Sequence, residues 1–111
     1  MREMIKIWLD DEVEPHTEGW VRTFTYAETI ELLLPGNVQC LNLDHDLGED
    51  ESVGTGYHVL LWLEKEVYTK DFKPPTDMRV HSANSAARPK MEQAIEQIKR
   101  YAKRNLENGS D

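Results

Sequence analysis

The chain has 111 residues, with 21 Asp and Glu against 13 Lys and Arg, which gives a formal net charge of −8. This length suits one compact domain, and 39% hydrophobic residues suffice for a core, so wholesale disorder is excluded. No apolar run approaches the roughly 20 residues of a membrane span. An acidic chain is also unsuited to binding along the phosphate backbone of duplex nucleic acid. The single cysteine, Cys40, and the absence of a signal-peptide pattern predict a cytoplasmic protein.

The first half of the chain predicts two strands. Residues 4–9 form a short apolar run that ends abruptly in acid, which is typical of a buried strand. Residues 21–26 alternate and are half β-branched, which favours an edge strand. The link between them is shorter than the dozen residues of an ordinary parallel crossover. Either one helical turn bridges a parallel pair, or the second strand runs antiparallel.

Helices and strands then alternate. Thr25 and Glu28 fit a capping box that opens a helix, and Pro35-Gly36 ends it. Residues 38–43 read as a strand, residues 56–68 as a helix and residues 78–81 as a short strand. The alternation indicates an α/β fold with a mainly parallel sheet.

The last helix carries a single apolar stripe, formed by Met91, Ala94, Ile95, Ile98, Tyr101 and Ala102. The first strand is apolar on both faces, so both faces of the sheet need cover. We therefore expect the last helix to pack on the face opposite the other two, giving three layers. We expect one domain over residues 1–106 and a frayed tail at 107–111.

Three of the expected strands end in polar clusters, which are Asp10-Asp11, Asp44-His45-Asp46 and His81-Ser82-Ala83-Asn84. Two of these lie in the acidic stretches 10–14 and 44–51, which hold nine of the 17 acids among residues 1–87. A solvated acidic loop explains either stretch alone. Ligands of parallel α/β sheets, however, bind at the carboxyl ends of the strands, where these clusters converge if their strands are neighbours.

Crowded carboxylates repel each other, and a hard divalent cation relieves that repulsion. Asp10, Asp11 and Asp44 are the candidate ligands, and the expected cofactor is Mg²⁺ or Mn²⁺.

Other residues of the clusters suit proton transfer. The imidazoles of His45 and His81 are suited to general acid or base work near neutral pH. Asp46 completes the candidate catalytic group. For each histidine the alternative is a ring held by hydrogen bonds at a strand end.

Ser82, Asn84 and Arg88 are the candidate phosphate-binding residues. The first two serve equally well as caps of the following helix, and Arg88 could instead pair with an acidic loop.

The segments IKIWLDDE, LNLDHDLG, TGYHVLLWLE and RVHSAN, followed by Arg88 and Met91, resemble the cyclic-phosphate processing receiver domains, a divergent branch of the response-regulator receivers. The resemblance covers residues 4–102. It implies a receiver- or flavodoxin-like sheet in strand order 2-1-3-4, truncated because a fifth strand with its lysine has no counterpart. Asp44 matches the phosphoacceptor position of receivers.

The resemblance implies a metal-dependent hydrolase that processes a cyclic phosphate, with a small phosphorylated molecule as partner. Two alternatives remain open. One is a regulatory module phosphorylated on Asp44, and the other is a binder of cyclic nucleotides without catalysis. Without a fifth strand the fourth becomes an edge, which invites pairing with a second copy of the chain.

Overall fold

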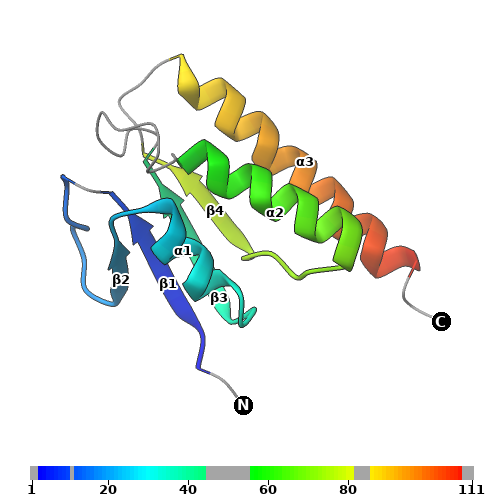
Figure 1. The fold of residues 1–111 in the computed structure, drawn as a ribbon, viewed down its shortest axis with the longest axis horizontal. Coiled ribbons are helices and arrows are strands. Elements are labelled where there is room, and N and C mark those ends of the chain that lie inside the picture. Colours follow the sequence, from blue (N-terminus) through cyan, green and yellow to red (C-terminus); the bar gives the residue numbers. More distant parts are fainter. Residues whose placement is uncertain (1–2, 11, 45–55, 82–85, 109–111) are drawn as a thin grey trace.

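The computed structural model describes residues 3–10, 12–44, 56–81 and 86–108. Along the chain these form β1 (Ile5–Leu9), β2 (Trp20–Thr23), α1 (Tyr26–Leu33), β3 (Val38–Leu43), α2 (Gly56–Lys70), β4 (Asp77–Val80) and α3 (Ala87–Asn108), shown in Figure 1. The last helix therefore runs past the expected domain boundary at residue 106. None of the described helices is both long enough and apolar enough to span a bilayer.

The four strands form one parallel sheet in the order β2-β1-β3-β4, which confirms the expected topology. Of the two directions left open for the second strand, the parallel one is correct. The chain between β1 and β2 makes the crossover without any helical turn in its described part. β4 lies at the edge of the sheet, as expected, and its pairing with another chain stays a prediction.

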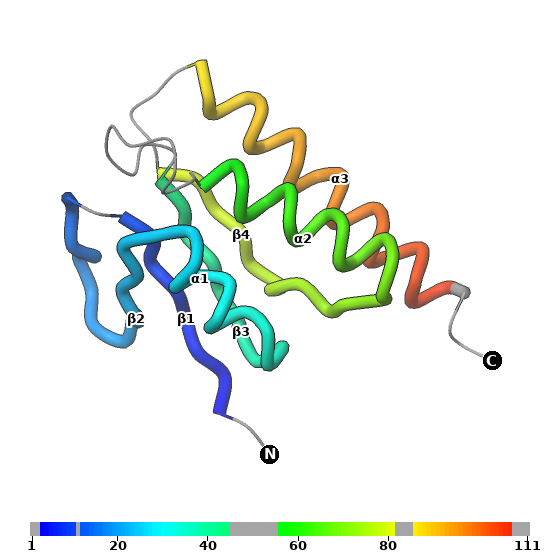
Figure 2. Tube along the Cα trace, in the orientation of Figure 1, coloured from blue at the N-terminus to red at the C-terminus, as the bar shows by residue number. Residues whose placement is uncertain are grey.

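One face of the sheet carries the hydrophobic core. Ile7 and Leu9 of β1 and Leu41 and Leu43 of β3 are fully buried in it, together with apolar side chains of all three helices. α2 and α3 pack directly against each other, and α1 contacts α2. Figures 1 and 2 show the three helices side by side.

The expected third layer is therefore wrong for the described part of the chain: α3 does not cross to the opposite face. The physical reason lies in its apolar stripe. Met91, Ile95 and Ile98 are buried in the same cluster as Leu41 of the sheet and Leu60 of α2. Once this stripe is used, α3 has no second apolar face for the other side of the sheet.

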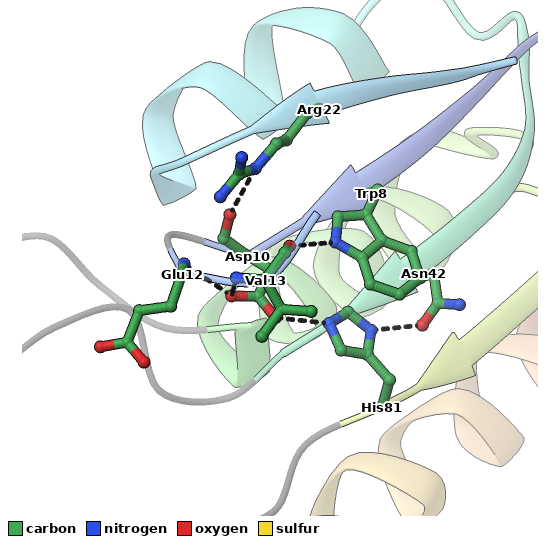
Figure 3. Close-up of polar contacts among 7 residues, drawn as sticks. All are labelled: Trp8, Asp10, Glu12, Val13, Arg22, Asn42 and His81. Atoms are coloured by element: carbon green, nitrogen blue, oxygen red, sulfur yellow. Dashed lines mark hydrogen bonds and ion pairs between the residues drawn. The ribbon is translucent and has the colours of Figure 1, made fainter. Parts of the chain in front are cut away.

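The opposite face of the sheet carries the alternate side chains of the strands. A register shift between Ile5 and Lys6 lets Val38 join the core. Trp8 and Cys40 are also buried but lie outside that core cluster. In Figure 3 the helices lie behind the sheet, and Trp8 and Asn42 lie in front of it.

The capping box at the start of α1 is confirmed in its main contact. The hydroxyl of Thr25 accepts a hydrogen bond of 3.2 Å from the amide of Glu28. The returning contact differs from the expected one, because the Glu28 carboxylate accepts from the amide of Phe24 at 3.1 Å rather than from that of Thr25. Beyond the helix, Gly36 has φ +78°, a left-handed conformation that favours glycine.

Candidate functional site

Two of the predicted acids lie side by side at the carboxyl edge of the sheet. Leu9 pairs with Leu43 across β1 and β3, so Asp10 and Asp44 are the next residues of neighbouring strands. The amide of Asp44 donates to the carbonyl of Leu9 at 3.0 Å. The amide of Asp10 donates to the carbonyl of Thr23 at 3.1 Å, which ties β2 to the same edge.

The carboxylate of Asp10 is buried, with only 2% of the residue exposed. Its Oδ1 accepts from the amides of Glu12 at 2.8 Å and Val13 at 2.9 Å, and its Oδ2 lies 3.0 Å from Nε2 of His81. Burial raises the pKa of Asp10, but the two amides and His81 together outweigh burial and hold it below its ordinary value. Asp10 is therefore a buried carboxylate that stays ionised.

His81, which directly follows β4, is held at both ring nitrogens. Nδ1 lies 2.6 Å from Oδ1 of Asn42, and Nε2 faces Asp10 as described above (Figure 3). An ionised carboxylate only accepts hydrogen bonds, so Nε2 must carry a proton. The ring also stacks on Trp8, with centroids 4.1 Å apart and planes 12° from parallel. His81 thus bridges Asp10 and Asn42 instead of presenting a free nitrogen.

The chain that follows Asp10 is fixed by further polar contacts. The indole Nε1 of Trp8 donates to the carbonyl of Val13 at 2.8 Å. Nε of Arg22 donates to the carbonyl of Asp10 at 3.1 Å, and its guanidinium lies 3.7 Å from Glu14. Figure 3 shows Arg22 of β2 at the carbonyl of Asp10 and Trp8 of β1 at the carbonyl of Val13. Both strands thus hold the backbone near Asp10.

The start of α2 packs against Asp44. Gly56 is buried, and a Cβ at this position would overlap the backbone carbonyl oxygen of Asp44. This added Cβ would also lie 3.0 Å from Cε of Met91 on α3. Glycine is therefore required here by close packing, and it brings the first turn of α2 onto the edge of the sheet that holds Asp44.

Arg88 lies in the first turn of α3, with about half of its side chain exposed to solvent. Its Nε lies 4.0 Å from the carboxylate of Glu92, one helical turn further on. This exposed ion pair, within one helix, is weak. The phosphate role of Arg88 stays a prediction.

The structure brings together three of the predicted site residues, Asp10, Asp44 and His81. The others of the three clusters, namely Asp11, His45, Asp46, Ser82 and Asn84, lie outside the described residues.

The described residues include no group of three His, Cys, Asp or Glu close enough to hold a metal ion. They supply two carboxylates at adjacent strand ends. Carboxylate oxygens are of the kind that Mg²⁺ and Mn²⁺ prefer, so the donor chemistry fits. A carboxylate oxygen has two lone pairs, so Asp10 could keep its hydrogen bond from His81 and still bind a cation.

Sequence reasoning missed two residues of this site. Asn42 is 8% exposed and holds Nδ1 of His81, and Trp8 covers one face of the ring. The available signal was an amide side chain next to the polar end of the apolar strand 38–43, where a buried polar side chain requires a partner.

The family model of the cyclic-phosphate processing receiver domain matches residues 5–97 of the chain. No curated protein and no solved structure was found to match the chain.

Proposed function

The chain belongs to the family of cyclic-phosphate processing receiver domains, and on that premise we propose that it is a metal-dependent hydrolase of a cyclic phosphate. The observation that carries the proposal is the meeting of Asp10, Asp44 and His81 at the carboxyl edge of a parallel sheet. Ligands of such sheets bind at this edge. A small cyclic phosphate, such as a cyclic nucleotide, is the proposed substrate class.

The proposed ligands of a divalent cation are Asp10, Asp44 and Asp11, which follows Asp10 in the sequence. When bound, such a cation polarises a phosphoryl group and lowers the pKa of a bound water. The low pKa of Asp10 supports this role, because the carboxylate stays ionised and ready to bind without losing a proton.

His81 acts in this proposal as a positioning residue for Asp10. Its Nε2–H holds one carboxylate oxygen, its Nδ1 is held by Asn42, and Trp8 stacks on one face of its ring. Hydrogen bonds of this kind orient metal-binding side chains in proteins. Because both nitrogens of His81 are occupied, we assign the general acid or base to His45, and Asp46, the next residue in the sequence, stays the other candidate catalytic residue.

In the proposed reaction, water attacks phosphorus and one ring P–O bond breaks. The single ring-opened product carries both a phosphomonoester and a free hydroxyl group. A general base takes a proton from the attacking water, and a general acid supplies the proton that the leaving oxygen takes up. Ser82, Asn84 and Arg88 are the proposed contacts to the phosphate oxygens; binding a phosphate would require Arg88 to turn away from Glu92.

The test is turnover of five- and six-membered cyclic phosphates of nucleosides with Mg²⁺, with Mn²⁺ and after chelation. Activity is expected only with a divalent cation. The triple variant Asp10→Ala, Asp11→Ala, Asp44→Ala is expected to lose it by about a hundredfold or more. Asp77→Ala is the matched control, since it removes a carboxylate at the opposite end of the same sheet. Equal turnover in the triple variant and the wild type would refute the proposal.

One observation favours a second candidate function, a regulatory module phosphorylated on Asp44. His81 is fully engaged by Asp10 and Asn42, an arrangement that supports a fixed structure as readily as catalysis. Incubation with a small phosphodonor followed by intact-mass measurement separates the two. A stable single phosphate adduct that Asp44→Asn abolishes, without turnover of any cyclic phosphate, would favour regulation.

A further inference from the structure

Two exposed apolar side chains lie next to Asp10, the buried carboxylate of the candidate site. Phe24 is 44% exposed and Val13 is 47% exposed. The amide of Val13 donates to Oδ1 of Asp10 at 2.9 Å. The amide of Asp10 donates at 3.1 Å to the carbonyl of Thr23, the residue before Phe24. We call Val13 and Phe24 the apolar rim of the site, because the backbone ties both of them to Asp10.

The ring of Phe24 lies on the same face of the sheet as the carboxylate. Leu9 pairs with Thr23 across β1 and β2, so Asp10 and Phe24 are the next residues along neighbouring strands. Leu9 belongs to the core, and the hydroxyl of Thr23 contacts that of Thr29 on α1 at 2.7 Å. Because successive side chains alternate between faces, Asp10 and Phe24 both point away from the helices. Adjacent strands lie about 4.8 Å apart, so one small ligand can reach both residues.

Arg22 restrains the ring of Phe24. Its guanidinium carbon lies 4.4 Å from the centre of that ring, an attractive contact between a cation and an aromatic face. The same side chain donates through Nε to the carbonyl of Asp10 (Figure 3). One arginine therefore holds both the ring and the backbone of the carboxylate, and nearly half of Phe24 still remains exposed.

The core does not account for the apolar rim. Among the described residues, the core cluster and the side chains packed against it include neither Phe24 nor Val13. Apolar surface of this kind is stabilised when a ligand removes it from water. A nucleobase has flat apolar faces that stack on aromatic rings, whereas the cyclic phosphate of a sugar or polyol offers mainly hydroxyl groups. The rim therefore suits a ligand that carries a base.

We propose that the apolar rim binds the base of a nucleoside cyclic phosphate. The base stacks on Phe24, its edge lies against Val13, and the phosphate lies at Asp10 and Asp44. The site thereby selects nucleoside cyclic phosphates over those of sugars and polyols. Stacking does not read the hydrogen-bonding edges of a base, so the rim accepts purines and pyrimidines alike. This inference rests on the proposed function, because it names the substrate class of the same site.

The first test compares two substrates with the same reacting ring, the five-membered cyclic phosphates of adenosine and of glycerol. The wild type is expected to show at least about tenfold higher kcat/KM for the adenosine compound. Phe24→Ala is expected to lower that value about tenfold and to leave the glycerol compound unchanged, whereas Phe24→Tyr keeps the selectivity. Leu34→Ala is the matched control, since it removes an exposed apolar side chain at the other end of α1.

The second test measures binding without turnover. The probe is a slowly hydrolysed adenosine cyclic phosphorothioate, added to the full chain with Mg²⁺ and followed by calorimetry. Phe24→Ala is expected to bind it about tenfold more weakly than the wild type and Leu34→Ala equally well. The base protons of the probe are expected to shift upfield in the presence of the wild type, as stacking on a ring requires, and to lose that shift with Phe24→Ala.

The outcomes separate this inference from the hydrolase proposal. Weaker probe binding by Phe24→Ala, in the absence of turnover of any cyclic phosphate, would refute the hydrolase and support base binding. Turnover with equal kcat/KM for the adenosine and glycerol compounds would support the hydrolase and overturn base binding. Equal losses for both compounds in Phe24→Ala, no loss for either, or no binding of the probe to the wild type would each overturn base binding as well.

Discussion

Replacing His81 by alanine tests whether this residue holds the site together. The change removes the hydrogen bond to the buried Asp10 carboxylate, the contact with Asn42 and the stacked ring beside Trp8. A hydrogen bond to a charged group contributes about 1.5–3 kcal/mol, and an aromatic pair adds about 0.5–1.5 kcal/mol. We therefore expect His81→Ala to lower the free energy of unfolding by about 2–4.5 kcal/mol. For a chain of this length that corresponds to a fall in Tm of about 8–18 °C.

The assay is urea denaturation at neutral pH, followed by tryptophan fluorescence and by circular dichroism. His16→Ala is the control, because His16 is exposed and its ring contact with Trp8, at 6.5 Å between centroids, is looser than that of His81. That variant is expected to lose less than about 1 kcal/mol. If His81→Ala were as stable as His16→Ala, the bridging role assigned to His81 would be refuted.

Three further predictions concern packing and titration. Gly56→Ala is expected to cost about 1–3 kcal/mol, because its Cβ would overlap the carbonyl of Asp44; wild-type stability would contradict this packing. The pKa of Asp10 is lower folded than unfolded, so its stabilisation is present above about pH 4 and is lost as pH falls through the folded-state value. Asp10→Asn is therefore expected to flatten the acid limb of a stability–pH curve, and an unchanged limb would count against this shift. Burial, with the charge of Asp77, raises the pKa of the Cys40 thiol. Alkylation of Cys40 should therefore be at least about tenfold slower in the folded protein than in the urea-unfolded protein. Equal alkylation rates would show that the thiol is accessible.

The alternation of strands and helices predicted a mainly parallel sheet, with the direction of the second strand left open, and the resemblance to the receivers implied the strand order. Apolar runs that end in Asp10 and Asp44 mark strand ends directly, and strand order then makes them neighbours. The capping box of Thr25 could likewise be predicted from the sequence, because its main hydrogen bond joins residues only three positions apart.

The layer arrangement could not be read in the same way. Trp8 made β1 look apolar on both faces, which suggested that a helix must cover each. In the structure Trp8 is buried instead by the His81 ring and by the chain near Val13, to which its indole donates. A loop and a ring can bury an aromatic side chain as well as a helix does, and periodicity does not distinguish them.

The partners of His81 were also beyond local pattern. Asn42 and Asp10 lie 39 and 71 residues away along the chain, and only the register of three strands brings them together. Of the two interpretations left open for His81, the ring's contacts favour a ring held by hydrogen bonds at a strand end over a free general acid or base.

We propose that the strand-end carboxylates hold the divalent cation of a cyclic-phosphate hydrolase. The most direct measurement is anomalous diffraction from crystals soaked with Mn²⁺ and a slowly hydrolysed cyclic phosphorothioate. We expect a manganese peak coordinated by Asp10 and Asp44, with the phosphorus density beside it. Well-diffracting soaked crystals with no manganese at these two carboxylates, or with the phosphorothioate bound elsewhere, would contradict the claim.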